Sequence, residues 1–140
     1  MNGGQVSAEF ESEFEIGGRA VGGSAPVLII AEAGVAHFGD VQLAEQLVDL
    51  AADAGADVFK TQFFDVEAMI AESAAEWRER LRPRNLSLDE FRALKQRCDK
   101  RGLLFMATAH DETRLPWLKD LDVPAIKIGS GERNNPEFLK

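Results

Sequence analysis

Lysines end or interrupt two apolar runs of this chain, where a charged side chain is costly. Lys60 ends the run in DVFKTQ, and Lys127 lies between two isoleucines in IKIGSGE. Burying an ammonium costs on the order of several kcal/mol unless an anion compensates it. Two such lysines indicate one shared site for an anionic ligand.

Other polar residues follow the same kind of apolar run. In parallel β/α folds the carboxyl ends of the strands form the active-site edge. Two lysines and two hydroxyls at such an edge suit a ligand that has both a carboxylate and a phosphate. The polar residues at these positions are Glu32, Lys60, Gln62, Thr108, His110, Asp111, Lys127, Ser130 and Glu132.

Each of these residues also has a structural interpretation. A lysine at a strand end can neutralise a buried carboxylate such as Glu32, and Ser130 can form a turn with Gly131. His37 and His110 are more typical of surface or core histidines than of metal ligands. The four arginines of WRERLRPR are more typical of a solvated helix face than of a phosphate site.

The elements that would position these residues alternate along the chain. Amphipathic patterns predict helices over 40–55, 87–102 and 111–121, with Asp40 as an N-cap and a capping box from Ser87 to Glu90. Apolar runs predict strands over 26–32, 56–62, 103–108 and 124–129.

Strands that alternate with helices predict a parallel α/β fold. A closed (β/α)8 barrel takes about 250 residues, so four strands predict about half of a TIM barrel, and the family resemblance given below implies the N-terminal half. A short hairpin is expected over 14–23 before the first strand. Residues 1–13 are expected to be a flexible N-terminus, and 14–140 the partial barrel domain. No GxGxxG motif follows the first strand, which disfavours a dinucleotide-binding fold.

Composition excludes several classes of protein. The 140 residues have a net charge of −8, which argues against nucleic acid or an anionic membrane as a partner. Cys98 is the only cysteine, so neither an internal disulfide nor a cysteine-based metal cluster can form. The first residues lack the pattern of a signal peptide, and a cytoplasmic location is expected.

Four motifs in this order give the chain a family resemblance: IIAEAGVAHFGD, LAADAGADVFKTQ, FMATAHDE and VPAIKIGSGE. They resemble the N-acetylneuraminate (sialic acid) synthase family and its spore coat polysaccharide relatives. That family's usual forms are I-A-E-I-G-x-N-H-N-G, A-G-A-D-x-x-K-x-Q, S-T-P-F-D and K-I-x-S-G-[DE]. The resemblance implies a condensation of phosphoenolpyruvate with an N-acylated amino sugar such as N-acetylmannosamine, with release of phosphate.

The resemblance also implies roles for individual residues. Glu32 matches a catalytic carboxylate beside the reacting carbons. Gln62, Glu132 and His37 match the sugar side of the site. A divalent metal, manganese or magnesium, is expected for the full-length enzyme with ligands outside this chain, as is a homodimer. The residues that match the phosphoenolpyruvate site are Lys60, Thr108, Lys127 and Ser130.

The chain departs from the family motifs on the acceptor side. Ala36 and Phe38 replace two asparagines, and Phe38 is expected to narrow the space there. Thr108-Ala109-His110 replaces Thr-Pro-Phe. The motifs therefore leave the acceptor sugar open.

Three other hypotheses explain parts of the pattern. A Schiff-base aldolase would use Lys127 as its nucleophile. A non-catalytic half-barrel could bind an anion through the same lysines. A flavodoxin-like structural domain leaves both lysines unexplained.

Overall fold

A two-stranded hairpin opens the part of the chain that the computed structural model describes, residues 11–140. β1 (Glu13–Ile16) pairs antiparallel with β2 (Arg19–Gly22) around Gly17 and Gly18. Both glycines have positive φ, +57° and +77°, as a two-residue hairpin turn requires. The hairpin lies where it was predicted. The predicted flexible N-terminus lies mostly outside the described residues.

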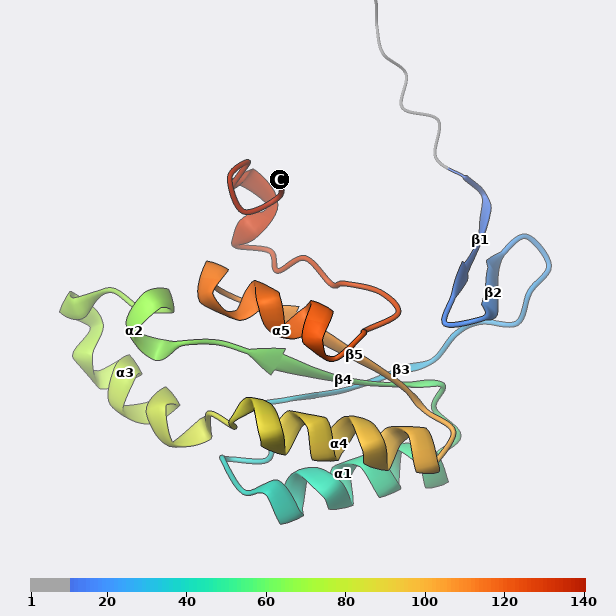
Figure 1. Cartoon of the computed structure of the whole chain (residues 1–140), viewed down its shortest axis with the longest axis horizontal. Helices are drawn as coiled ribbons and strands as arrows, with labels where there is room; N and C mark the ends of the chain where they lie inside the picture. Colours follow the sequence, from blue (N-terminus) through green and yellow to red (C-terminus); the bar gives the residue numbers. More distant parts are fainter. Residues whose placement is uncertain (1–10) are drawn as a thin grey trace, which may run out of the picture.

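The centre of the molecule is a parallel sheet with the strand order β3-β4-β5 (Figure 1). β3 (Ile30–Gly34) starts later than predicted because residues 26–29 do not pair as a strand. Instead, Ile29 accepts hydrogen bonds from the backbone N–H groups of Asp57 and Val58. The other two strands, which match their predicted positions, are β4 (Val58–Phe63) and β5 (Leu104–Ala109).

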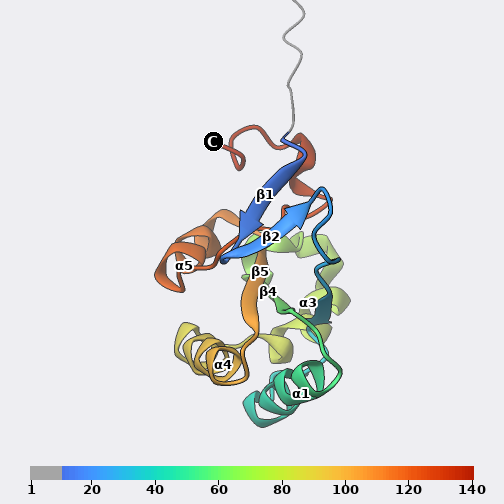
Figure 2. The same cartoon turned by 90° about the vertical axis from the view of Figure 1, so that its right-hand side faces the viewer.

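Two long helices, α1 (Val41–Asp53) and α4 (Leu88–Lys100), pack side by side on one face of the sheet (Figure 2). The Asp40 carboxylate caps α1 by accepting from the N–H groups of Gln42 and Leu43. Ser87 and Glu90 form the capping box of α4. Both caps are those predicted from sequence.

Shorter elements complete the chain around the sheet. The segment between β4 and α4 contains α2 (Val66–Met69) and α3 (Ala75–Leu81), and α5 (Leu115–Asp120) follows β5. Pro116 lies in the first turn of α5, where its missing N–H costs little. The 3-10 turns are η1 (Glu72–Ala74), η2 (Arg82–Arg84), η3 (Glu112–Arg114) and η4 (Glu132–Asn134).

Alternation along the strands places the phenylalanines of the core on one face and the predicted site residues on the other. Phe59, Phe63 and Phe105 point toward the helices and join the buried core. Phe63 packs against Phe91 of α4 at 4.5 Å between ring centroids. The alternate residues of the same strands, among them Lys60, lie on the opposite face. This face must build any site at the strand ends.

The predicted count of four strands is confirmed only in part. Residues 124–129 form a single parallel bridge, between Ala107 and Ile126, and no complete strand. The Lys127 N–H reaches the Ala107 carbonyl only at 3.5 Å, and Pro124 has no N–H to donate. The segment is therefore joined to β5 by one weak contact and stays irregular. Ile126 and Ile128 are exposed.

Candidate functional site

Three of the predicted site residues meet at the carboxyl ends of the parallel strands. Glu32, Lys60 and Met106 are in register across β3, β4 and β5, and Gln62 is in register with Thr108. Lys60 forms an ion pair with Glu32, and its Nζ lies 3.4 Å from Thr108 Oγ1. The Lys60 side chain is 13% exposed and that of Glu32 is 44% exposed. The structure thus holds a largely buried ammonium between a carboxylate and a hydroxyl.

Gln62 converges on the same group through the space beside Gly34. A Cβ at Gly34 would lie 3.4 Å from both Gln62 Nε2 and Glu32 Oε1. Gly34 also has a φ of +54°, which side chains rarely adopt. A larger residue at this position would contact both polar groups, so glycine keeps the end of β3 open.

Lys127 and Ser130 lie on the irregular edge segment and are both exposed. Lys127 Nζ donates to the carbonyl of Ile128 at 2.6 Å and forms no ion pair among residues 11–140. Besides burial, which is the larger cause, the charges of Lys60 and Lys127 both lower the pKa of His110. Their predicted joint role in holding an anion remains a prediction.

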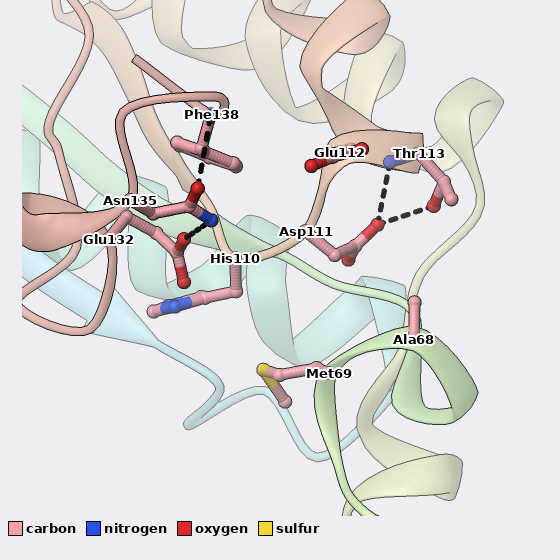
Figure 3. Close-up of a pocket in the computed structure, with 9 residues that line it drawn as sticks. All are labelled: Ala68, Met69, His110, Asp111, Glu112, Thr113, Glu132, Asn135 and Phe138. Atoms are coloured by element: carbon pink, nitrogen blue, oxygen red, sulfur yellow. Dashed lines mark hydrogen bonds between the residues drawn. The ribbon is translucent and has the colours of Figure 1, made fainter.

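A cavity of about 350 Å³ opens at the residues that directly follow β5 (Figure 3). Glu132, predicted for the sugar side, is in its wall, and its carboxylate accepts from Asn135 Nδ2 at 3.0 Å. His110 and Asp111, also expected at the strand ends, line it too, whereas Glu32, His37, Lys60, Gln62, Thr108, Lys127 and Ser130 do not. The wall residues are Ala68, Met69, His110, Asp111, Glu112, Thr113, Glu132, Asn135 and Phe138.

His110 is the titratable side chain of the cavity with a displaced pKa. Burial lowers the pKa of its imidazole and the Lys60 ammonium lowers it further, while Glu132 and Asp111 oppose them. The ring is therefore neutral near pH 7. Its Nε2 is buried and has no hydrogen-bond partner in the described part of the chain. This histidine replaces the phenylalanine of the resembled motif, and that departure was the sequence signal for it.

Asp111 has a structural role in the cavity wall. Its buried carboxylate accepts from the N–H groups of Asp65, at 2.6 Å, and Thr113, at 3.0 Å. It therefore ties the end of β5 to the segment that follows β4. No local pattern predicted this long-range tie, nor the presence of Met69 and Asn135 in the wall.

His37 lies in the loop after β3 and is fully buried. Its Nδ1 accepts from the N–H of Gly39 at 3.1 Å, and its Nε2 has no partner among residues 11–140. Burial lowers the pKa of His37, against a smaller opposing effect of Glu90. Phe38, expected to narrow the substrate side, is exposed with φ +52°, and the Arg84 guanidinium lies 4.5 Å from the centre of its ring.

Residues 11–140 contain no group of three or more His, Cys, Asp or Glu side chains that could hold a metal ion. The ligands of the divalent metal that the resemblance implies were expected outside this chain, and that expectation remains a prediction. Within the same residues, no helix is long and apolar enough to cross a membrane.

Comparisons by sequence find similar proteins over most of the chain. The family model described as NeuB family matches residues 47–140. Human N-acetylneuraminate-9-phosphate synthase is 34% identical over 135 residues, which cover 88% of this chain and 38% of that protein. The spore coat polysaccharide biosynthesis protein SpsE of Bacillus subtilis is 31% identical over 137 residues, 91% of this chain and 37% of that protein. The chain spans less than two fifths of the length of these curated relatives.

Comparisons by structure find similar folds. N-acetylneuraminic acid (sialic acid) synthetase of Leptospira borgpetersenii, crystallised with citrate, has a TM-score of 0.86 and 38% identity over 91% of this chain and 44% of that one. SpsE of Bacillus subtilis has a TM-score of 0.76 and 32% identity over 91% of this chain and 36% of that one. The comparisons by sequence and by structure therefore both find sialic acid synthases and SpsE.

Proposed function

Because this chain belongs to the NeuB family, we propose that it carries part of the site of a sialic acid synthase-like enzyme. The reaction condenses phosphoenolpyruvate with an N-acylated aldose, N-acetylmannosamine or a related sugar, and releases phosphate. The observation that supports this most is the meeting of Glu32, Lys60 and Thr108 at the strand ends. A largely buried ammonium in reach of a hydroxyl is suited to an anionic substrate.

In this proposal Lys60 and Thr108 bind the phosphate or the carboxylate of phosphoenolpyruvate. Lys127 and Ser130 complete the anion site from the edge segment, which a single bridge joins to β5. The Lys127 ammonium gives up its bond to the Ile128 carbonyl when a stronger anionic acceptor is present.

Glu32 acts on the charge that develops during the reaction. As C3 of phosphoenolpyruvate attacks the aldehyde carbon, positive charge develops at C2, where water then adds and from which phosphate leaves. A carboxylate beside C2 stabilises this charge or takes a proton from the water. Gln62, Glu132 and His37 belong to the acceptor side, where Glu132 is already in the cavity wall.

We propose that the remaining parts of the active site come from residues that are not among those named above. In this proposal the matched segment is the N-terminal half of a TIM barrel. The residues that bind the manganese or magnesium ion come from the other half. The complete enzyme is proposed to be a cytoplasmic homodimer. No role of the residues named above depends on the metal.

The test is phosphate release by the complete polypeptide with phosphoenolpyruvate, N-acetylmannosamine and Mn²⁺. Release that requires both substrates, with a nine-carbon sugar acid found by mass spectrometry, is the expected result. Release without the sugar, or no release with any N-acylated hexose, would reject the function. A Schiff-base aldolase would instead be trapped covalently at Lys127 by borohydride with a keto substrate.

A further inference from the structure

One side of the cavity is built by a short stretch with little stability of its own. Residues 65–70, here called the wall segment, contain the single turn of α2 and place Ala68 and Met69 against the cavity. An isolated helical turn is unstable in water because nucleation is costly. The shape of the wall segment therefore depends on side chains that tie it down.

The start of the wall segment is tied to β5 and its following turn. The Asp65 N–H donates to Asp111 at 2.6 Å, and the Asp65 carboxylate accepts from Arg114 Nη2 at 3.0 Å. The same carboxylate caps the turn through the N–H groups of Glu67 and Ala68, at 2.9 Å and 3.3 Å. These contacts leave the far end of the segment without a tie to the sheet.

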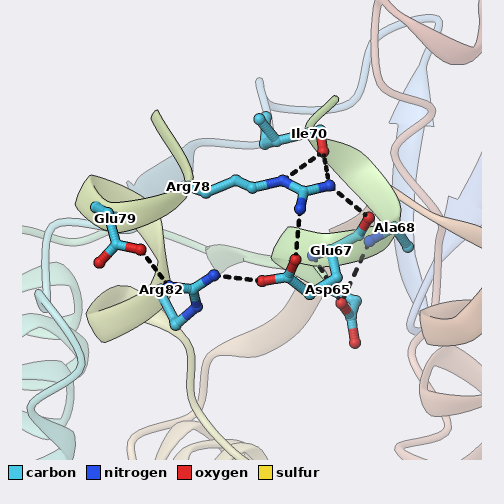
Figure 4. A network of polar contacts seen from close by, with 7 residues as sticks. All are labelled: Asp65, Glu67, Ala68, Ile70, Arg78, Glu79 and Arg82. Atoms are coloured by element: carbon cyan, nitrogen blue, oxygen red, sulfur yellow. Dashed lines mark hydrogen bonds and ion pairs between the residues drawn. The ribbon is translucent and has the colours of Figure 1, made fainter. Parts of the chain in front are cut away.

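Arg78 of α3 holds the far end (Figure 4). Its Nε and Nη2 donate to the carbonyl of Ile70 at 2.9 Å and 2.6 Å, and its Nη1 pairs with the Glu67 carboxylate at 2.7 Å. The side chain is only 16% exposed. Arg82 pairs with the second carboxylate oxygen of Glu67 at 2.6 Å.

Arg80 differs from Arg78 and Arg82 in its contacts. Arg80 is exposed, and its guanidinium lies 4.9 Å from the centre of the Trp77 ring, with no bond to the wall segment. Of the four arginines of WRERLRPR, Arg78 and Arg82 bond the wall segment and Arg84 lies over the Phe38 ring, whereas Arg80 has the solvated position expected for all four. The rigid fork of the Arg78 guanidinium lets it donate twice to the Ile70 carbonyl and once to the Glu67 carboxylate at the same time.

We propose that Arg78 is a positioning residue, which fixes the wall segment and thereby the shape of the acceptor side of the cavity. The effect on the sugar rests on the proposed function, in which the cavity receives the N-acylated aldose. The effect on the wall segment itself does not. Arg78 touches no substrate in this proposal and acts through Ala68 and Met69.

Hydrogen–deuterium exchange of the complete polypeptide tests the tie without any substrate. In Arg78→Gln the backbone amides of residues 67–70 should exchange about ten- to hundredfold faster, as the loss of a bond from a charged donor implies. Arg78→Lys keeps the charge but not the fork, so we expect partial protection. Glu67→Gln, which keeps both bonds to Ile70, should have a smaller effect. Arg80→Gln is the matched control and should exchange like the wild type.

Steady-state kinetics test the consequence for the acceptor. Arg78→Gln should raise KM for N-acetylmannosamine about tenfold with kcat within about twofold, because uniform binding is lost, and KM for phosphoenolpyruvate should not change. A purely structural role would lower kcat through a smaller active fraction and leave KM alone. Equal exchange in Arg78→Gln and Arg80→Gln would overturn the proposal, as would equal KM values. If the wild type shows no turnover, the proposed function fails, and the exchange result alone decides whether Arg78 holds the wall.

Discussion

Glu32 and Lys60 form the pair whose role matters most at the scale of single residues. Sequence allows either a structural salt bridge or a catalytic carboxylate. The structure shows a Glu32 side chain that is 44% exposed, so its contribution to stability is screened by solvent. The Glu32 carboxylate is therefore accessible to a small ligand, as the proposed catalytic role requires.

Glu32→Gln tests this role because it preserves shape and removes charge. We expect the fold to persist, with a loss of unfolding free energy of about 1 kcal/mol or less. Turnover of the complete polypeptide should fall by about 10²- to 10⁴-fold, the usual contribution of an acid–base group. Chemical denaturation and single-turnover phosphate release measure the two effects. Normal turnover in a well-folded variant would show that Glu32 is not catalytic.

Lys60→Met tests the anion site. Removing a charged hydrogen-bond donor should weaken binding of phosphoenolpyruvate by about 1.5–3 kcal/mol, measured by isothermal titration calorimetry. Lys95→Met is the control, since Lys95 pairs with Asp99 on the outer surface of α4. If both variants bind equally well, Lys60 is only a partner for Glu32.

At the scale of elements, the loop between β3 and α1 is held by close backbone contact. Gly39 has a φ of +83°, and a Cβ there would lie 1.9 Å from the carbonyl oxygen of Pro83. Gly55, which ends α1, has a similar φ of +78° but open space around it. A comparison of substitutions at Gly39 and Gly55 therefore distinguishes the cost of backbone strain from the cost of steric contact.

Gly39→Ala should lower the unfolding free energy more than Gly55→Ala does. In Gly55→Ala the loss of unfolding free energy comes only from the left-handed backbone and is about 1–2 kcal/mol. Gly39→Ala must also move the backbone at Pro83, which adds about 1–3 kcal/mol. Urea denaturation of both variants measures the difference. Equal losses would mean that the loop moves away from Pro83 without cost.

At the scale of the whole molecule, two histidines with lowered pKa values couple stability to pH. Burial is the largest cause for both His37 and His110. As pH falls below about 6.5, the unfolded chain takes up these protons before the folded chain does. Unfolding then binds protons, so stability is full above pH 6.5 and declines below it.

We expect the unfolding free energy to fall between pH 6.5 and 5 by at most about 1.4 kcal/mol per pH unit for each histidine. Asp49 and Glu67 also have lowered pKa values, through hydrogen bonds from Arg97 and Arg82, but they titrate at lower pH. The double variant His37→Gln/His110→Gln should flatten the slope in this window. Denaturant titrations at several pH values measure it, and an unchanged slope would assign the effect to other groups.

The sequence by itself determined those features that depend on neighbours along the chain. The caps at Asp40 and Ser87 and the glycine hairpin follow from local hydrogen bonding and backbone geometry. The meeting of Lys60 and Thr108 also followed, because parallel strands bring their carboxyl ends to one edge.

Only the tertiary structure decided the features that depend on distant partners. The segment around Lys127 meets β5 at a single bridge, where the local pattern predicted a strand. The cavity wall is joined by Asp111 and Arg78, which contact residues 46 and 8 positions away. The burial that lowers the pKa of His110 arises from the same packing. Such contacts form because folding closes these loops around a shared core, and no short stretch of sequence records which of them will meet.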